Sequence, residues 1–368
     1  MIRQGALAGE EGFSTSDLPG IGGVCRQDPA DFQVEEIPLY EPDGKGEFLF
    51  VRLQKTGLAH GEMLRRMSAV LGIHPREIGF AGMKDKHAVT VQWLSLPGSV
   101  ENRLALLEGE DMTLLQVARH SRRLATGHLQ GNQFRVRISG LDPTAAALHT
   151  TRARAITDRL CTKGMVNFFG PQRFGGRFAN IGLGLALLQG EPVNRKYRKG
   201  AMARLVLSAA QSWIFNLYAR RRWADPGPDT LLDGEVLTFR RGRSLFRSDR
   251  PEHDRQRLQQ GEVHLTGPMP GGKMLQPVGA ARLYEDTFWR DTGLSEELFA
   301  GHGKKLRGER RALRVFPEEV ECRFSGDSKS LGLSFRLPAG SYGTVFISEI
   351  TKSGPPSRAR IRPDAGAT

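Results

Sequence analysis

The chain has 368 residues, a formal net charge of +13 and an isoelectric point near 10.0. Its length exceeds that of one typical domain, so we expect two domains, each with its own core. The excess positive charge favours a polyanionic partner, nucleic acid first of all, although such a charge can also serve solubility alone.

Cysteine usage and hydropathy exclude further classes of protein. Cys25, Cys161 and Cys322 lie far apart and form no Cys-x-x-Cys pair, which argues against a zinc ribbon or a disulfide framework and suits a reducing cytoplasm. No apolar run is long enough to cross a bilayer, and the chain begins without a charged and then apolar leader. We therefore expect a cytoplasmic protein.

The first part of the chain predicts a loose Gly-rich segment, then two strands and a helix. Turn residues separate the strands, and apolar residues recur at helical spacing up to Gly72, which is a typical helix stop. In chain order these are residues 1–22, 31–37, 47–53 and 61–71. By pattern alone, Phe32 in the first strand is a core residue.

Residues 80–90 form a Gly-bearing loop with a single carboxylate, Asp85, set among Lys84, Lys86 and His87. A half-buried strand pattern follows at 91–96, so Asp85 lies on a tight connection at the end of buried elements, where reactive groups are often presented. Neighbouring cations favour the ionised carboxylate, the form that attacks an electrophilic carbon or takes a proton. The pattern alone also allows a solvated turn with ordinary surface charges.

The next segments predict two strands and a helix. Residues 112–119 read as a strand that ends in a basic cluster at 119–123, suited to phosphate contacts or simply a charged loop. Gly131-Asn132 predicts a turn before a strand in which Phe134 and its alternate neighbours share one face. A helix should begin with Asp142 as its N-cap and continue to Lys163.

Residues 166–175 place aromatic side chains between Gly and Pro, next to Gln172 and Arg173. Such residues can stack on bases and bind phosphates, or they can pack as an interdomain loop. The pattern leaves both interpretations open.

The last part of the chain predicts a basic run, a long buried helix and then a return to strands. The strand pattern includes the segment that follows the turn at Pro338, and scattered arginines without apolar periodicity predict a disordered tail. In order, these segments are 195–199, 205–222, 320–324, 331–337, 342–347 and 352–368.

Two apparent ligand motifs are rejected. The segment 267–273 has the Gly and Lys spacing of a phosphate loop, but two prolines remove backbone donors and no Ser or Thr follows the Lys. The nine histidines show no clustering of the metal-site type, so no metal is expected.

Several segments together resemble one family. The loop Gly79–Thr90, followed by Gln92-Trp93, resembles the signature of the TruD-type tRNA pseudouridine synthases. Four further segments match the family: Asp-Phe-x-Val-Glu-Glu at 31–36, Gly-Asn-x-Phe at 131–134, Asn-x-Phe-Gly-x-Gln-Arg-Phe-Gly at 167–175, and Leu-Pro-Ala-Gly-Ser-Tyr at 337–342. Gly343 stands where the family usually has Ala. The resemblance covers nearly all of residues 23–350.

The resemblance implies an α+β fold, a pseudouridine synthase catalytic domain with a mixed, largely antiparallel sheet. This domain would be discontinuous, formed by residues 1–162 and 310–351. A mostly helical TRUD domain would be inserted at 163–309, and 352–368 would be the tail.

The resemblance also implies the reaction, which is isomerisation of a specific uridine in tRNA, at position 13 in the family, to pseudouridine. Asp85 would be the catalytic residue, attacking C1′ or removing the 2′ proton. The resemblance places Phe32 and Tyr342 in the active site, gives Asn132 a role in substrate binding, and places Phe134 near the site. The target base must leave its stack, so an aromatic wall makes chemical sense.

Lys84 would be a positioning cation in this site. The reaction needs no cofactor, because no redox change or group donor is involved. The partner implied is tRNA, with no membrane, metal or obligate protein partner.

Parts of the sequence also fit two other functions. A non-catalytic RNA-binding or RNA-folding protein on the same scaffold would keep the basic surface and could dispense with Asp85. A donor-dependent RNA methyltransferase would need a Gly-rich cofactor loop after a strand, and the sequence has none.

Overall fold

The computed structural model describes residues 12–25, 27–240, 242, 244–302, 306–325 and 329–352. It divides the chain into two compact units. Unit 1 contains Met1–Ser16, Lys163–Phe316 and Ser341–Glu349, and unit 2 contains Asp17–Thr162, Pro317–Gly340 and Ile350–Thr368.

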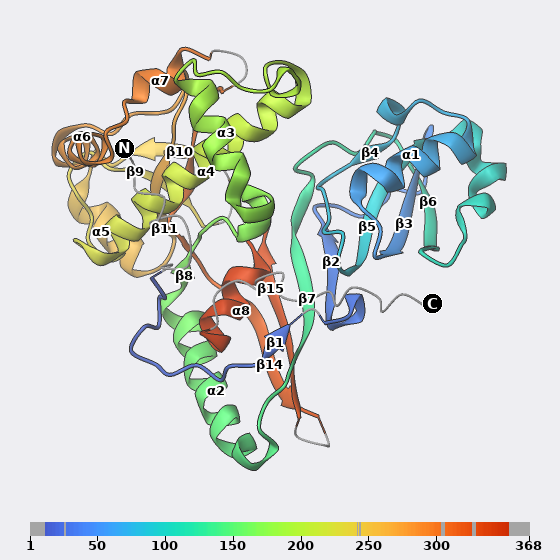
Figure 1. The fold of residues 1–368 in the computed structure, drawn as a ribbon, viewed down its shortest axis with the longest axis horizontal. Coiled ribbons are helices and arrows are strands. Elements are labelled where there is room, and N and C mark those ends of the chain that lie inside the picture. The colour runs from blue at the N-terminus through green and yellow to red at the C-terminus, as the bar shows by residue number, and fades with distance from the viewer. Residues whose placement is uncertain are drawn as a thin grey trace, which may run out of the picture. The chain divides into compact units, whose positions relative to one another are not determined.

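Unit 2 is built on a nine-stranded sheet in its described residues (Figure 1), with the order β14-β15-β7-β2-β5-β3-β6 and with β1 on β7 and β4 on β5. Only β2 and β5 are parallel, so the expected mixed, largely antiparallel sheet of an α+β fold is confirmed. The strands are β1 Val24–Cys25, β2 Phe32–Pro38, β3 Phe48–Thr56, β4 Gly79–Phe80, β5 Val89–Pro97, β6 Met112–His120, β7 Leu129–Ser139, β14 Glu318–Phe324 and β15 Ser330–Pro338.

Alternating side chains of β2, β7 and β15 give one face of this sheet an aromatic stack. Phe134 lies opposite Val34 on β2 and opposite Phe335 on β15. The Phe134 ring stacks on Phe335 at 4.9 Å between centroids, and Phe32 meets it edge to face at 6.0 Å. Period-two patterning therefore predicted these positions correctly as buried.

Two helices cover this face of the sheet toward its two ends. Helix α1, His60–Leu71, packs Met63 and Met67 on the apolar residues of β3 and ends at Gly72, whose φ of 64° suits glycine. Helix α2, Ala146–Lys163, lies along β14 and β15 (Figure 1), where His149 stacks on Phe324. The strand register puts the residues beneath both helices on one face. The middle of that face carries the polar residues of the candidate site.

The remaining helical turns of unit 2 are short 3-10 segments: η2 Pro29–Asp31, η3 Pro75–Glu77, η4 Gly98–Leu107 and η5 Pro143–Ala145. The last one leads into α2 with the Asp142 side chain accepting a hydrogen bond from Thr144 N, which confirms the predicted cap.

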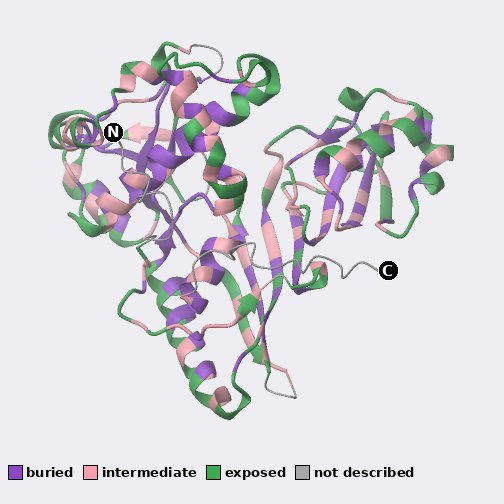
Figure 2. Cartoon of the chain, in the orientation of Figure 1, coloured by how far each residue is buried: buried purple, intermediate pink, exposed green. Residues whose placement is uncertain are grey.

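Unit 1 is mostly helical, with a small sheet of order β10-β9-β11-β12 and a two-stranded pair β13-β8. Buried residues recur along its central helix α4 (Figure 2). Its helices are α3 Ala179–Leu188, α4 Gly200–Ala224, α5 Pro251–Gln259, α6 Gly279–Thr292, α7 Glu296–Ala300 and α8 Gly343–Thr351, whose last two residues belong to unit 2. Its 3-10 turns are η6 Pro171–Phe174, η7 Gly176–Phe178 and η8 Arg195–Tyr197. Its strands are β8 Met165–Val166, β9 Val236–Phe239, β10 Leu245–Arg247, β11 Val263–Met269, β12 Glu309–Ala312 and β13 Arg314–Val315.

Helix α3 crosses α4 closely, and this explains a glycine in the sequence. A Cβ on Gly184 would lie 2.2 Å from the backbone oxygen of Val206. Any larger residue would force the two helices apart. Gly182 and Gly184 both lie within helix α3.

Two predictions were wrong. Gly131 and Asn132 are not a turn but lie within β7, paired with Ile37 and Glu36 on one side. Gly131 is needed at this position because a Cβ would come within 2.5 Å of Leu337 O on β15.

Residues 342–347 are not a strand, because Gly343 begins helix α8. Val345, Phe346 and Ile347 are all buried. The segment therefore has no one-sided apolar stripe by which its helix could be recognised in the sequence.

At the chain ends, the predicted tail lies outside the described residues apart from Lys352. Over the part of the chain that is described, no helix combines the length and the apolarity needed to span a membrane.

Candidate active site

Asp85 lies in the loop that joins β4 to β5, and the ends of this loop are fixed by strand pairing. Gly79 of β4 pairs with Ser95 of β5, and a Cβ on Gly79 would lie 2.2 Å from Ser95 Oγ. Within the loop, Asp85 is partly buried, whereas Lys86 and His87 are exposed. Asp85 is therefore less exposed to solvent than the two basic residues that follow it.

A buried lysine holds the loop at Asp85. Lys55, near the end of β3, is fully buried, and its Nζ donates hydrogen bonds to Leu58 O at 2.8 Å and to Asp85 O at 2.6 Å. Burial lowers the pKa of Lys55 to about 8; the negative charge of Asp85 opposes the shift and nearby Lys84 adds to it. Lys55 thus fixes the backbone of Asp85 and brings a cation close to its carboxylate.

Lys84 makes the second connection between the loop and the sheet. Its Nζ lies 3.1 Å from Glu36 Oε2 on β2 and donates a hydrogen bond to Asn132 Oδ1 on β7. The Lys84 and Glu36 side chains are only 6% and 1% exposed. Burial lowers the pKa of Lys84 and raises that of Glu36, and in each case the partner charge opposes the shift. Lys84 is therefore not a solvated surface charge.

The contact with Lys84 also fixes the side-chain amide of Asn132. An ammonium group can only donate hydrogen bonds, so the oxygen of the Asn132 amide must face Lys84. Its NH₂ group keeps its donors for another partner. Asn132 lies directly opposite Glu36 in the β2–β7 register, which places both side chains on the same face of the sheet.

Polar atoms with incomplete hydrogen bonding gather on this face. Thr90 and Gln92 of β5 lie opposite Lys55 and Leu53, and His60 begins α1. Within the described residues, the buried polar side-chain atoms of Thr90, Gln92 and His60 have no hydrogen-bond partner of ordinary geometry. Such atoms are rare in protein interiors and often mark functional sites.

His60 carries no charge at neutral pH. Burial lowers its pKa to about 4, and the nearby charges of Lys55 and Lys84 lower it further. Its ring meets Phe80 edge to face at 4.7 Å. The neutral imidazole of His60, near the ammonium groups of Lys55 and Lys84, therefore adds polarity to the site without adding charge.

The structure brings the predicted site residues together in two contacts. Lys84, next to Asp85 in the loop, binds Asn132, and Phe32 contacts Phe134. Asn132 and Phe134 are alternate residues of β7, so the two contacts share a face. Phe32 and Phe134 are 1% and 5% exposed, as expected for core residues. Tyr342 belongs to unit 1, where its ring meets Phe169 edge to face at 5.7 Å.

The sequence analysis missed Glu36, Lys55 and His60. A signal was present for the first two, because each occupies a core-facing position of an alternating strand. Glu36 continues the buried series of Phe32 and Val34, and Lys55 continues the buried series on β3. A charge at such a position needs a buried partner.

This arrangement suits chemistry by one carboxylate. Two buried ammonium groups interact favourably with the charge of Asp85, and an ionised carboxylate can act as a nucleophile or as a base. Among the residues that the structure describes, no group of His, Cys, Asp and Glu could hold a metal ion.

Comparison with known proteins identifies the family. The family model described as tRNA pseudouridine synthase D (TruD) matches residues 9–195 and 197–350. The chain belongs to the TruD family. A tRNA pseudouridine synthase D from Anaeromyxobacter sp. (strain Fw109-5) is 37% identical over 343 residues, covering 92% of this chain and 95% of the relative. A tRNA pseudouridine synthase D from Thermus thermophilus is 36% identical over 342 residues and covers 92% of each chain.

A solved structure agrees with the TruD fold. The crystal structure of a putative tRNA pseudouridine synthase D (TruD) from Methanosarcina mazei superimposes with a TM-score of 0.71, covering 92% of this chain and 95% of that one. At 23% sequence identity, this likeness supports the fold alone.

Proposed function

We propose that this TruD protein isomerises a specific uridine of tRNA, at position 13 as the resemblance implies, to pseudouridine, with Asp85 as the catalytic carboxylate. The observation that carries the proposal is the double anchoring of the Asp85 loop. Lys55 holds the backbone of Asp85, and Lys84 ties the preceding residue to Glu36 and Asn132. A loop of surface charges would need neither buried contact.

The reaction places defined demands on these residues. Asp85 attacks C1′ or removes the 2′ proton as the C1′–N1 bond breaks. The uracil then turns, and C5 bonds to C1′ while the bond from Asp85 to C1′ breaks or the 2′ proton returns to C2′. C5 loses a proton and N1 gains one, so the composition is unchanged and no oxidant or group donor is required. A uracil carbonyl can accept a hydrogen bond from the amide NH₂ of Asn132, which Lys84 orients.

Aromatic side chains would hold the flipped base. Phe32 and Phe134 are buried, so they support the floor of the site, and Tyr342 is only partly buried. Tyr342 is therefore our candidate for direct stacking on the base.

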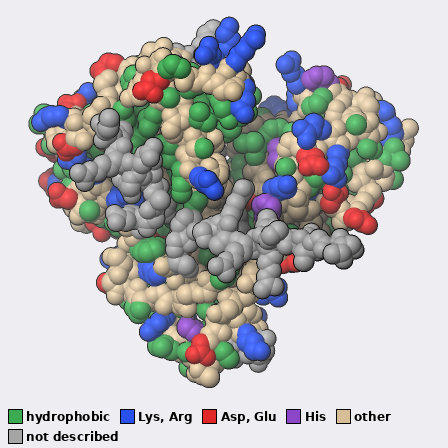
Figure 3. Space-filling model, viewed as in Figure 1, with side chains coloured by type: hydrophobic (Ala, Val, Ile, Leu, Met, Phe, Trp, Pro, Cys, Tyr) green, Lys and Arg blue, Asp and Glu red, His purple; other side chains and the backbone are tan. Residues whose placement is uncertain are grey.

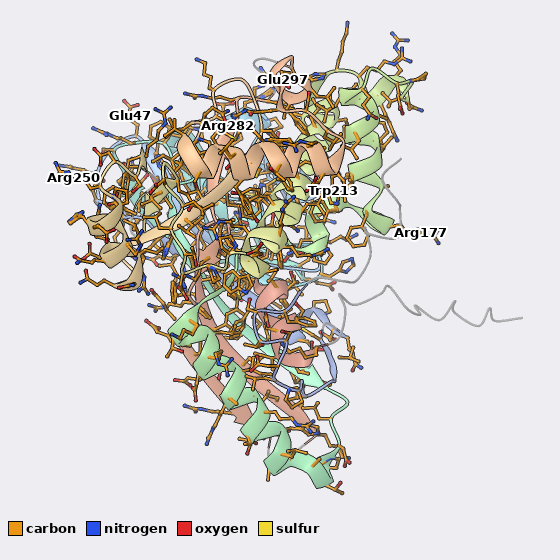
Figure 4. The ribbon with its side chains drawn as sticks, turned by 90° about the vertical axis from the view of Figure 1, so that its left-hand side faces the viewer. Glu47, Arg177, Trp213, Arg250, Arg282 and Glu297 are labelled. Atoms are coloured by element: carbon orange, nitrogen blue, oxygen red, sulfur yellow. The ribbon has the colours of Figure 1, made fainter. Side chains whose placement is uncertain are left out.

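Exposed cations of unit 1 would bind the RNA backbone. Arg195, Lys196, Arg198 and Lys199 lie in η8 and just before α4, and all four are exposed. Figure 3 shows Lys and Arg side chains gathered over the connection between α3 and α4. Arg177 in η7 also points away from the ribbon (Figure 4). Such contacts position RNA through its phosphates and weaken with salt.

The domain organisation and location belong to the same proposal. Residues 163–309 would form the inserted TRUD domain, and 1–162 with 310–351 the catalytic domain. A tRNA substrate and three cysteines without a paired motif suit the cytoplasm.

The test compares purified wild-type protein with Asp85→Asn in pseudouridine formation on tRNA transcripts. We expect the variant to lose activity by about 10³-fold or more while binding tRNA with unchanged Kd, because only the chemical group is removed. Asp158→Asn, an exposed carboxylate of α2, is the control and should retain activity.

Two outcomes contradict the proposal differently. If Asp85→Asn forms pseudouridine at the wild-type rate, the catalytic assignment is wrong. If the wild-type protein binds tRNA but forms no pseudouridine at any site, the non-catalytic RNA-binding alternative is the better account.

A further inference from the structure

The signature segment 167–175 belongs to unit 1 and is not among the residues described around Asp85. In unit 1 its side chains converge on the residues around Tyr342. We infer that Asn167, Phe169, Gly170 and Gln172, together with Arg311, form a socket that positions the Tyr342 ring. This inference rests on the proposed function, in which Tyr342 stacks on the target base.

Phe169 is fixed rigidly to helix α4. Its backbone N donates to Asn216 Oδ1 at 2.8 Å, and Asn216 Nδ2 donates back to Phe169 O at 2.9 Å. The Phe169 ring stands perpendicular to Phe215, with 5.7 Å between centroids and an interplanar angle of 88°. The same ring meets Tyr342 at 5.7 Å and 60°. Phe169 therefore gives Tyr342 an immobile surface.

Arg311 of β12 ties the backbone of the signature to the residue before Tyr342. Its guanidinium lies 4.1 Å from the centroid of the Phe169 ring, and it donates to Asn167 O at 3.0 Å and Asn167 Oδ1 at 2.6 Å. Ser341 Oγ donates to the same Asn167 Oδ1 at 3.2 Å. Burial lowers the pKa of Arg311 to about 10, so it remains charged at neutral pH.

Gly170 and Gln172 hold the other side of Tyr342. A Cβ on Gly170 would lie 2.5 Å from Thr344 Oγ1 and 2.9 Å from Tyr342 Cδ1. The φ of Gly170 is −73°, open to any residue, so glycine is needed here for space alone. Thr344 Oγ1 donates to Gln172 Oε1 at 3.1 Å.

The socket thus fixes Tyr342 at its ring and at residues on both sides of it. Fixing the rotamer in advance reduces the freedom that is lost when the ring stacks on a base. The socket residues are positioning residues, since their contacts are with Tyr342 and its neighbours. This accounts for the aromatic, Gly and Gln positions of the second signature.

The kinetic test uses Gly170→Ala, with Gly98→Ala as its matched control. Gly98, the first residue of η4 in unit 2, is also crowded, since its Cβ would lie 2.8 Å from Glu47 O, but its near neighbours include neither Tyr342 nor a socket residue. We expect Gly170→Ala to lower kcat by about 10-fold to 100-fold, and Gly98→Ala to change it by less than about 3-fold.

A double-mutant cycle separates positioning from general stability. In a Tyr342→Ala background, Gly170→Ala should cause no further loss, because the ring it displaces is absent. Arg311→Lys is a milder second variant, which keeps the charge but loses the paired hydrogen bonds to Asn167. Arg311→Lys should lower kcat when Tyr342 is present and should cause no further loss in the Tyr342→Ala background.

A spectroscopic readout is independent of activity. Incorporated 3-fluorotyrosine labels five positions, Tyr40, Tyr197, Tyr218, Tyr284 and Tyr342, and Tyr342→Phe identifies the resonance of interest. Gly170→Ala and Arg311→Lys should shift the Tyr342 resonance, whereas Gly98→Ala should leave it in place.

The outcomes distinguish this inference from the proposed function. An unmoved Tyr342 resonance, or additive losses in the cycle, overturns the socket. If the resonance moves as expected but Tyr342→Ala isomerises tRNA at the wild-type rate, the socket stands and the stacking role of Tyr342 fails.

Discussion

Buried charges occur in both units, but they are satisfied in different ways. In unit 1, Arg222 pairs with Glu235 and Arg310 pairs with Glu285, with all four side chains 0–2% exposed. In unit 2, Lys84 pairs with Glu36 beside Lys55. These two fully buried pairs of unit 1 use arginines, whereas the pair at the Asp85 loop of unit 2 uses a lysine.

The arginines of unit 1 have nearly complete sets of partners. Arg222 donates to both oxygens of Glu235, at 3.3 and 3.1 Å, and to the carbonyls of Gly227 and Thr230. Arg310 donates to Glu285 and to Thr266 O and Oγ1, at 3.2 and 2.9 Å. A planar fork with this many acceptors holds a fixed structure.

The polar face of unit 2 is less complete. Among the described residues, the carboxylate of Glu36 has the ion pair with Lys84 and only a weaker approach of the Trp93 backbone N–H, and nearby side-chain atoms of His60, Thr90 and Gln92 lack well-formed hydrogen bonds. Incomplete satisfaction is costly, so its concentration at the Asp85 loop favours a functional rather than a structural role. A buried charge with a complete set of hydrogen-bond partners therefore indicates a structural role, whereas one with an incomplete set indicates a functional site.

The largest expected effect is on the framework. Glu285→Gln keeps the shape of the side chain but leaves Arg310 buried without its counter-charge, so the free energy of unfolding should fall by about 3–5 kcal/mol. Urea unfolding followed through Trp213 and Trp289, both buried in unit 1, measures it. The double variant Glu285→Met with Arg310→Met should recover most of the loss, and a single-variant loss below about 1 kcal/mol would contradict the comparison.

A smaller effect on stability but a clear one on activity is expected in unit 2. Glu36→Gln should loosen Lys84 and lower kcat by about 10-fold to 100-fold, because the Asp85 loop loses one anchor. Glu35→Gln is the matched control, since Glu35 lies next to Glu36 on β2 but pairs with Arg52 in a partly exposed position. Equal kcat values for the two variants would show that the ion pair of Lys84 is merely structural.

The smallest effect is a pH dependence shared by the two units. Burial lowers the pKa of His60 in unit 2 and of His264 in unit 1 to about 4, from an ordinary value of about 6.5. As the pH falls, these two histidines are protonated in the unfolded chain before they are protonated in the folded protein. The free energy of unfolding is therefore unaffected by them above about pH 6.5 and decreases as the pH falls from 6.5 to about 4.

Calorimetry at several pH values measures this effect. His60→Gln and His264→Gln should each flatten the fall of Tm between pH 6.5 and 4 by a few degrees. Variants that keep the full wild-type slope would show that these rings titrate normally.

Much of the fold could be predicted from the sequence because its signals are local. The alternation of Phe134, Val136 and Ile138 predicted strand β7, and Gly72 predicted the end of α1. Helix α8 was missed because burial on most sides removes helical periodicity. Glycine is needed at position 131 because of its close contact with Leu337 O. A local sequence pattern cannot reveal a contact between residues so far apart in the chain.

The candidate site was predictable in part and for a different reason. Asp85, Lys84 and Asn132 stood out through resemblance, and spacing could not reveal that Lys84 binds Asn132. Glu36 and Lys55 required the pairing of strands to be known, because their partners come from the loop after β4. The socket joins Asn167 to Ser341, a link that exists only in the folded unit.

The order of synthesis gives the β7–β15 pairing a further consequence. β7 pairs with β15 from Ser139–Ser330 to Gly131–Pro338, so the ribosome must translate the whole of residues 163–316 before β7 receives this neighbour. Until then one edge of a long strand is open to other chains. The side chains of Arg135 and Arg137 do not protect this edge, because they project from the face opposite Phe134 and pair with Glu35 and Asp31. The interval before β15 is made is therefore when the nascent chain is most exposed to intermolecular pairing.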